Sequence, residues 1–245
     1  MLQTLQTRLT AKKRLTEDVY ILELTPEDGS FDFKAGQYVI LHIPQSNGET
    51  VRRLYSIASS AHTPGSFELL VKFLPGGVAS EFLKKLPLGE SFMCQGPAGI
   101  FILKPPTRDI VFLATGTGYA PIRSMLDHLF YHEPHFKHNI YLYWGFQKHD
   151  HVYLLSELVE WTKKFPRFHF NICLSRHHPD DPVSPELIPH IQMGRATQVW
   201  EKLHENANIQ GAGYYLCGGR EIVDGMKEFM ASKGLSKEQV HAEKF

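Results

Sequence analysis

The stretch IVFLATGTGYAPIRSML, residues 110–126, decides how the second half of this 245-residue chain folds. It predicts an apolar strand, a turn at Gly116, Thr117 and Gly118, and the start of a helix. Glycine lets the backbone turn tightly and approach a phosphate closely, and the N-terminus of a helix attracts anions. Pro121 suits the first helical turn, because its missing N–H would have no partner inside the helix. The stretch therefore predicts a turn that binds a pyrophosphate.

This glycine turn differs from the dinucleotide pattern G-x-G-x-x-G, because Pro121 takes the place of the third glycine. The next expected strand ends in WGFQ, residues 144–147, and has no acidic residue to hold an adenosine ribose. A dinucleotide site here would belong to a lineage other than the usual Rossmann one. An ordinary strand-to-helix turn is the alternative interpretation.

Apolar strands alternate with helical patterns over the rest of the second half. The expected strands are IVFLA, NIYLYWGF, HFNICLS and GYYLCGG, and the expected helices are PIRSMLDHLF, LLSELVEWTKKF and EIVDGMKEFMASKG. This alternation is typical of a parallel sheet with helices on both of its faces.

The first half consists of short apolar or alternating runs separated by turn residues, with one short helix expected at 78–86. The runs are VYILEL (19–24), QYVILHI (37–43), RLYSIAS (53–59), FELLVKFL (67–74) and SFMCQGP (91–97). Closely spaced strands of this kind predict a small antiparallel barrel. The proline pair in KPPTRD, residues 104–109, favours a boundary between a domain at 1–104 and a domain at 105–245.

Composition excludes several classes of function. The formal net charge is zero and no run of five like charges occurs, so we expect no nucleic-acid partner. No stretch of about 18 apolar residues or signal-peptide core is present, so we expect no membrane span and a cytoplasmic location. Cys94, Cys173 and Cys217 lie far apart, which argues against a disulfide framework, a cysteine zinc site or a built-in iron–sulfur cluster. Any redox centre is then an organic cofactor.

The 14 histidines raise the question of a metal site. His132, His135 and His138 share a three-residue spacing, but Pro134 interrupts them in what we expect to be a loop. We therefore expect no metal site.

Six short motifs occur in the order found in the ferredoxin–NADP reductase superfamily, which the whole chain resembles. They are RLYS at 53–56, GGVAS at 76–80, GPAGIF at 96–101, GTGYAP at 116–121, LCGG at 216–219 and a final EKF. The resemblance implies a flavin-binding antiparallel β-barrel domain followed by an α/β parallel-sheet NAD(P)-binding domain. Within the superfamily, the sequence is most similar to bacterial stand-alone ferredoxin or flavodoxin NADP reductases.

The resemblance assigns the flavin to the first half. Arg53 would pair with a flavin phosphate, since a guanidinium fits phosphate oxygens, while Tyr55 would pack on the isoalloxazine and Ser56 would hydrogen-bond near its hydride-accepting nitrogen. The flavin-binding set implied in this half is Arg53, Leu54, Tyr55, Ser56, Gly76, Gly77, Val78 and Ser80. A second phosphate site at GGVAS favours FAD over FMN. From the residues alone, an ordinary strand is the alternative interpretation of RLYS, and a plain helix cap is that of GGVAS.

The resemblance assigns the nicotinamide nucleotide to the second half. The implied binding set is Thr115, Gly116, Thr117, Gly118, Pro121, Ser175, Arg176, Arg195, Cys217, Gly218, Gly219 and Phe245. Cys217 would touch the nicotinamide, although a small buried cysteine is an equal alternative. Ser175, Arg176 and Arg195 match the pattern of NADPH-using members and favour NADPH, with NADH possible.

The last residues, AEKF, would contribute to the chemistry. The resemblance implies that Phe245 covers the flavin face and moves aside for the nicotinamide, with Glu243 as a polar partner. A frayed end of a last strand is the alternative. Ser56, Cys217, Glu243 and Phe245 are thus the candidate catalytic residues.

These residues predict an FAD-dependent oxidoreductase that takes hydride from NADPH and passes electrons to a ferredoxin or flavodoxin, reversibly in principle. Within the same class, the alternatives are a reductase component of an oxygenase and a reductase of free flavin. From other classes, a nucleotide-binding interaction subunit without turnover and a classical Rossmann dehydrogenase stay open.

Overall fold

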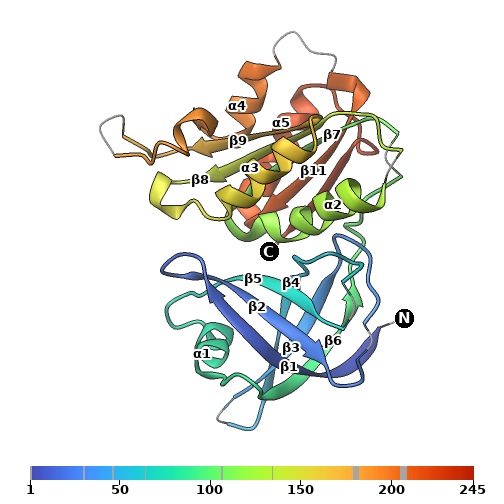
Figure 1. The fold of residues 1–245 in the computed structure, drawn as a ribbon, viewed down its shortest axis with the longest axis vertical. Coiled ribbons are helices and arrows are strands. Elements are labelled where there is room, and N and C mark those ends of the chain that lie inside the picture. Colours follow the sequence, from blue (N-terminus) through green and yellow to red (C-terminus); the bar gives the residue numbers. More distant parts are fainter. Residues whose placement is uncertain are drawn as a thin grey trace. The chain divides into compact units, whose positions relative to one another are not determined.

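The structure, a computed structural model, describes residues 2–29, 31–45, 47–63, 65–105, 107–133, 135–178, 182–204 and 209–245. The chain forms two compact units (Figure 1). The first unit consists of Met1–Lys104 and Ala120–Glu133, and the second of Pro105–Tyr119 and Pro134–Phe245. Among the described residues, every helix is too short or too polar to cross a membrane.

The first unit is a curled antiparallel sheet of six strands in the order β4-β3-β6-β1-β2-β5. An isolated bridge between Ile57 and Leu69 joins its two edges, and the backbone N–H of Ala58 donates to the carbonyl of Glu68 at 2.8 Å. The sheet therefore closes into the barrel that the sequence predicts. Its elements are β1 (Gln3–Arg14), β2 (Val19–Pro26), β3 (Tyr38–Pro44), β4 (Thr50–Ser56), β5 (Phe67–Lys72), α1 (Val78–Lys85) and β6 (Ser91–Ala98).

Strand β1 is the longest strand among the described residues and was not predicted from the sequence. Its buried residues are Leu5, Thr7 and Leu9, which alternate with exposed neighbours as expected for a half-buried strand. The polar Thr7 and the lysine and arginine residues of this segment weaken the apolar pattern on which strand prediction depends. Only pairing with β2 and β6 makes the segment a central strand of the barrel.

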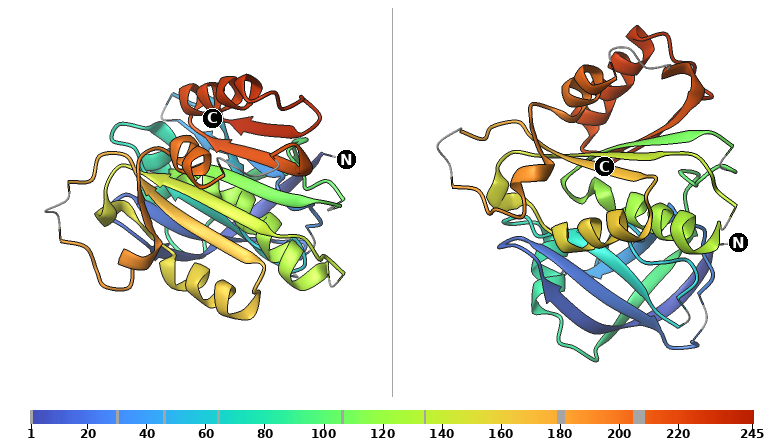
Figure 2. Two further views of the ribbon diagram at one scale, coloured as in Figure 1. Left: turned by 90° about the horizontal axis from the view of Figure 1, so that it is seen from above. Right: turned by 45° about the horizontal axis from the view of Figure 1, so that its top comes forward.

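The second unit is a parallel sheet of six strands in the order β10-β9-β8-β7-β11-β12. Helix α3 covers one face, and helices α4 and α5 cover the other (Figure 2). This confirms the predicted parallel sheet, although the short strand β10 was not foreseen. The strands are β7 (Asp109–Thr115), β8 (Ile140–Phe146), β9 (Phe168–Leu174), β10 (Ile191–Met193), β11 (Ala212–Gly218) and β12 (Val240–Lys244); the helices are α3 (Leu155–Lys164), α4 (Ala196–Leu203) and α5 (Arg220–Ser232). Helix α2 (Tyr119–His132) begins at the last residue of the segment Pro105–Tyr119, and from Ala120 on it belongs to the first unit.

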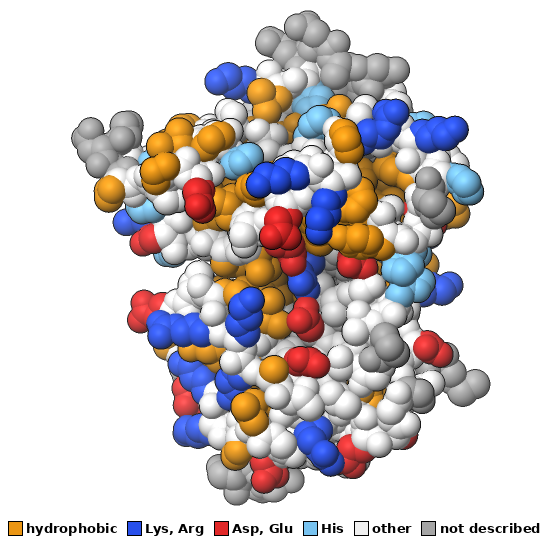
Figure 3. Space-filling model, viewed as in Figure 1, with side chains coloured by type: hydrophobic (Ala, Val, Ile, Leu, Met, Phe, Trp, Pro, Cys, Tyr) orange, Lys and Arg blue, Asp and Glu red, His pale blue; other side chains and the backbone are white. Residues whose placement is uncertain are grey.

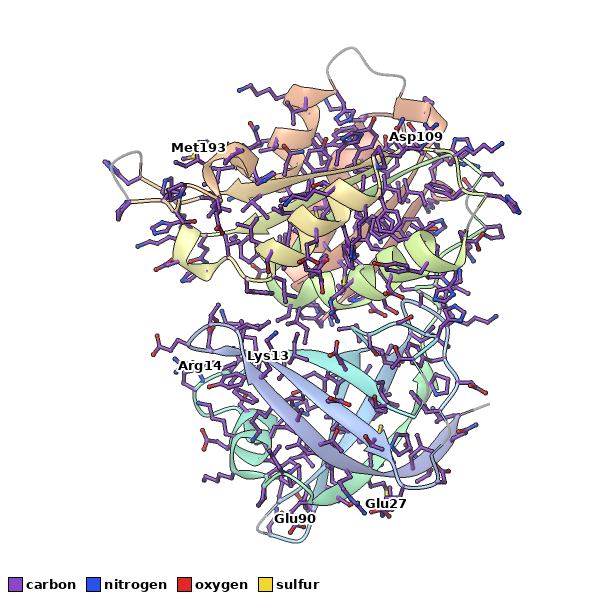
Figure 4. All side chains as sticks on the ribbon, viewed as in Figure 1. Lys13, Arg14, Glu27, Glu90, Asp109 and Met193 are labelled. Atoms are coloured by element: carbon purple, nitrogen blue, oxygen red, sulfur yellow. The ribbon has the colours of Figure 1, made fainter. Side chains whose placement is uncertain are left out.

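All six strands of this sheet run in the same direction, so their carboxyl ends share one edge. Figure 4 marks the two edges: Asp109 begins β7, and Met193 ends β10. Ligands of open parallel sheets bind at the carboxyl edge. The fold thus identifies this edge as the place to look for a site.

Charged side chains of both signs are interspersed on the face seen in Figure 3, over the described residues of each unit. Several are paired within a unit, such as Lys72 with Asp18 at 3.1 Å. Such pairs at an exposed surface contribute little to stability.

Candidate functional site

Strand β4, which contains RLYS, lies at one end of the strand order of the first unit and has no fully buried residue. Leu54 is 56% exposed, and Arg53 is exposed with its Nη1 donating to the carbonyl of Arg52 at 2.9 Å. The exposed Arg53 guanidinium suits a ligand phosphate. Leu54, the next residue, points to the other face of the strand and offers an apolar surface there.

Tyr55 and Ser56 differ from these neighbours, because both are half-buried. Tyr55 packs against the hydrophobic core of the barrel, and burial raises the pKa of its hydroxyl despite the opposing charge of Arg53. Ser56 ends β4 opposite Tyr38. The residues of RLYS thus lie in different environments: the Arg53 cation is exposed to solvent, and the neutral Tyr55 phenol packs against the core.

The GGVAS segment forms a turn and the start of α1. Gly76 has φ +69°, a conformation that favours glycine, and Gly77 caps the helix without a side-chain hydrogen bond. The Ser80 hydroxyl is 5% exposed and accepts a hydrogen bond from the Leu74 N–H at 2.8 Å, while Val78 is exposed. Ser80 therefore holds the turn together. The first backbone N–H groups of α1 are the donors that this segment offers to a phosphate.

In the second unit, the glycine turn has the predicted arrangement. Strand β7 ends at Thr115, a short 3₁₀ helix spans Gly116–Gly118, and α2 begins at Tyr119 with Pro121 in its first turn. Gly116 has φ +50°, which a side chain would strain. No atom lies within 4 Å of a Cβ built on Gly116, so the turn is open on that side.

The glycine turn lies directly against the end of β11. A Cβ on Gly118 would collide with the Cys217 carbonyl oxygen and lie 2.8 Å from the Cα of Gly218. A Cβ on Gly218 would in turn collide with Thr115 Oγ1. Glycine at 118 and 218 thus permits the GTG and CGG motifs, one hundred residues apart in sequence, to meet backbone to backbone.

Cys217 is fully buried within β11, opposite Glu243 in the register of β12. Burial raises the pKa of its thiol well above the usual value, and the negative charge of Glu243 adds to this. Cys217 therefore stays a neutral thiol, which excludes a role as a thiolate nucleophile at neutral pH.

The EKF segment is anchored. The Phe245 N–H donates to the carbonyl of Gly218 at 3.3 Å, and the Phe245 carbonyl accepts from the Arg220 N–H at 3.0 Å. Lys244 Nζ donates to both carboxylate oxygens of Asp224 at 2.7 and 2.8 Å. The Phe245 ring itself is 57% exposed. The backbone is therefore held beside CGG while the ring stays accessible.

Ser175, Arg176 and Arg195 follow neighbouring strands at the carboxyl edge. Leu174 of β9 is paired with Met193 of β10, so Arg176 and Arg195 each come two residues after this pair. The Ser175 hydroxyl donates to the Phe146 carbonyl at 3.2 Å, and both arginines are exposed. The structure thus places two arginines, nineteen residues apart in sequence, after the ends of two paired strands.

Sequence reasoning missed Trp144, a fully buried residue of β8. Its indole N–H donates to the carbonyl of Gly116 at 2.9 Å, and its ring stacks on Tyr119 with centroids 4.0 Å apart. Buried tryptophans usually have an acceptor for their N–H, which is the one signal in the sequence that points to such a contact.

Arg123 of α2 was also missed. Its Nη1 donates to Glu68 Oε2 at 2.6 Å and to the carbonyl of Ala58 at 3.0 Å. Ala58 comes two residues after Ser56. The backbone of Glu68 bonds the same segment twice, because its carbonyl accepts from the Ala58 N–H and its N–H donates to the Ser59 hydroxyl. The ion pair therefore fixes the chain where it leaves RLYS. No local pattern predicts a contact between residues so far apart in sequence.

The two sets of residues fit the two nucleotide cofactors. In the first unit, the exposed Arg53 and Leu54 and the helix start at Gly77 offer a cation, an apolar surface and backbone donors, which suit FAD. In the second unit, an open glycine turn and two exposed arginines lie at the carboxyl edge of the sheet, with the neutral Cys217 thiol buried behind it, which suits NAD(P)H.

Comparison with known families gives a match for each half. Residues 6–102 match the oxidoreductase FAD-binding domain, and residues 112–228 match the oxidoreductase NAD-binding domain. Together the two matches cover most of the chain.

Similar proteins include two reductase components of propane 2-monooxygenase. The one from Rhodococcus jostii is 31% identical over 100% of this chain and 64% of its own length, and the one from Mycolicibacterium smegmatis is 33% identical over 100% and 68%. Among solved structures, a cytochrome P450 reductase of Amycolatopsis matches with a TM-score of 0.86 and 28% identity, over 100% of this chain and 70% of that chain. This chain thus spans about two thirds of the length of these relatives.

Proposed function

From the premise that this chain belongs to the ferredoxin–NADP reductase superfamily, we propose that it takes hydride from NAD(P)H onto bound FAD and delivers the electrons to a partner protein. The observation that carries the proposal is the carboxyl edge of the parallel sheet, where the GTG turn and the CGG motif follow the paired strands β7 and β11, and the two arginines follow the paired strands β9 and β10.

The proposed electron acceptor is the oxygenase component of a two-protein system, or a ferredoxin that serves one. This choice is supported by the names of the relatives, which are reductase components of oxygenases. The names thus favour the reductase component of an oxygenase, which the sequence left open as the alternative to a ferredoxin or flavodoxin reductase. With three dispersed cysteines, this chain offers no four-thiolate iron–sulfur relay, so electrons would leave it from the flavin.

The protein's part in the reaction is positioning. FAD accepts a hydride and releases electrons singly or in pairs. Arg53 would hold a flavin phosphate, Tyr55 would support the ring from the core side, and Ser56 would hydrogen-bond its reactive edge. Cys217, buried at the end of β11, would lie as a neutral thiol behind the nicotinamide, with Glu243 opposite it in the register of β12 and the exposed Phe245 ring beside the ligand. Binding both nucleotides makes hydride transfer a unimolecular step, which lowers the entropic part of the barrier.

We propose NADPH as the preferred donor. Two exposed arginines after β9 and β10 support this, since the 2′-phosphate of NADPH needs cations at the adenosine end. Replacing Arg176 or Arg195 by Ala should raise the Kd for NADPH about tenfold while changing that for NADH little. Arg167→Ala is the control, because Arg167 immediately precedes β9 and is thus at the opposite edge. Equal losses for both nucleotides would refute the assignment.

One experiment tests the proposed activity. The purified protein, reconstituted with FAD if necessary, is titrated with NADPH and NADH under nitrogen while its visible spectrum is recorded. We expect the flavin absorbance to bleach, and to recover when an oxidised ferredoxin is added. A protein that takes up no flavin would overturn the proposal. A protein that binds flavin but is not bleached would instead be an interaction subunit.

Two further assignments are proposals. We place the domain boundary at Lys104–Pro105, supported by the end of the first family match at 102 and the start of the second at 112. We also propose a cytoplasmic location, supported by three free and buried cysteines, which suit a reducing compartment. Limited proteolysis and cell fractionation test these assignments.

A further inference from the structure

The carbonyl oxygen of Gly116 is bonded twice from inside the second unit. The Trp144 indole N–H donates to it at 2.9 Å, and the Tyr119 backbone N–H also donates to it. Trp144 and Tyr119 are both fully buried. The carbonyl therefore points into the protein interior and has both of its lone pairs engaged.

This fixes the direction of the next backbone N–H. The peptide bond between Gly116 and Thr117 is trans, because the only cis bond among the described residues is Gly96–Pro97. In a trans peptide, the carbonyl and the following N–H point in opposite directions. With the Gly116 carbonyl directed inward to Trp144, the Thr117 N–H is directed away from the core. It lies in the first turn of a helix, where N–H groups have no acceptor within the helix.

The position of Trp144 is itself fixed by packing. Its ring stacks on Tyr119 and lies edge-on to Tyr153 at a centroid distance of 5.0 Å, and Phe146 packs beside it at 4.7 Å. A ring held on several sides has little freedom to move, so its N–H is a fixed donor. Gly116, at φ +50°, supplies the backbone conformation that lets its carbonyl meet this donor.

We propose that Trp144 is a positioning residue that aims the Thr117 N–H at the pyrophosphate of the bound nicotinamide nucleotide. This inference rests on the proposed function, because it specifies how the same glycine turn recognises its ligand. Trp144 does not touch the ligand. It acts by holding one peptide plane in the orientation that an anion requires.

Trp144→Phe tests the inference, because phenylalanine keeps an aromatic ring in the stack and removes the N–H. The probes are ADP-ribose, which has the pyrophosphate, and AMP, which lacks it. We expect the Kd for ADP-ribose to rise about 3- to 10-fold, as for the loss of one aimed hydrogen bond, and the Kd for AMP to stay unchanged. Flavin content and the flavin spectrum should also stay unchanged.

Trp200→Phe is the matched control. Trp200 is 2% exposed in the same unit, but its indole nitrogen has no hydrogen-bond partner among the described residues. The same substitution there should leave the Kd of both probes as in the wild type. Unchanged ADP-ribose binding in Trp144→Phe would overturn the inference, as would an equal loss of AMP binding. A wild-type protein that binds neither probe would instead refute the proposed function.

A measurement on the wild-type protein keeps the inference testable if Trp144→Phe does not fold. In ¹⁵N-labelled protein, the Thr117 amide resonance should shift on addition of ADP-ribose and remain in place on addition of AMP. The indole resonance of Trp144 should stay that of a hydrogen-bonded N–H in both cases. An unshifted Thr117 amide with ADP-ribose bound would overturn the inference.

Discussion

Gly118→Ala should destabilise the second unit, because the added methyl group has no room. A Cβ on Gly118 would lie 2.6 Å from the carbonyl carbon of Cys217 and 2.8 Å from the Cα of Gly218. These are backbone atoms of a central strand, so no flexible side chain can turn aside. The end of β11 and the glycine turn would have to separate.

The magnitude follows from the kind of clash. Overpacking of a well-packed interior costs about 1–3 kcal/mol, and a clash with backbone belongs in the upper part of that range. For a chain of this size, about 2–3 kcal/mol corresponds to a fall in Tm of about 4–12 °C. Because the turn that moves is the expected pyrophosphate site, the Kd for NAD(P)H should rise as well.

Differential scanning calorimetry and anaerobic NADPH titration measure the two effects. Gly225→Ala is the control, since no atom lies within 4 Å of a Cβ built there and Gly225 is inside α5. Alanine in a helix interior should stabilise by about 0.5–1 kcal/mol. A Gly118→Ala protein as stable as the wild type, with the same affinity for NADPH, would refute the argument from close approach.

Three other predictions concern the first unit and the thiol. Arg53→Ala should weaken flavin retention, measured as flavin per protein after gel filtration, whereas Ser56→Ala should keep the flavin and slow its reduction by NADPH; the reverse pattern would contradict this division. Arg123→Gln should lower the free energy of unfolding by about 1–3 kcal/mol, since it leaves the carboxylate of the partly buried Glu68 without that partner. Adding Glu68→Gln should recover part of that loss in urea unfolding, and strictly additive losses would exclude the coupling. Cys217, a buried thiol with a raised pKa, should react with iodoacetamide at pH 8 only after unfolding, and rapid labelling of the native protein would disprove its burial.

Local sequence patterns were sufficient for most elements of the fold. The apolar run before Gly116 and the helical pattern after Pro121 became β7 and α2, because apolar periodicity and turn chemistry act over a few residues. Strand β1 was not predicted, because the buried position 7 is occupied by a polar threonine where an alternating pattern requires an apolar residue.

The final EKF segment is ordered in the structure, although its own residues do not predict this. In isolation it is a short polar end for which fraying is a reasonable expectation. In the structure it pairs in parallel with β11, and Lys244 bonds Asp224 of α5. These partners lie more than fifteen residues earlier in the chain. β12 is therefore ordered by its pairing with neighbouring elements and not by the strand propensity of its own residues.

The sequence by itself determined the motifs and their order, because each motif is a few adjacent residues, and the family resemblance that these motifs carry implied the class of cofactor. Only the tertiary structure decided which motifs meet. It placed Gly118 against Cys217, brought Arg176 and Arg195 to neighbouring strand ends, and aimed the Trp144 indole at the Gly116 carbonyl. The physical reason is that these contacts depend on strand order and register, which are set by the packing of the whole sheet and leave no local trace in the sequence.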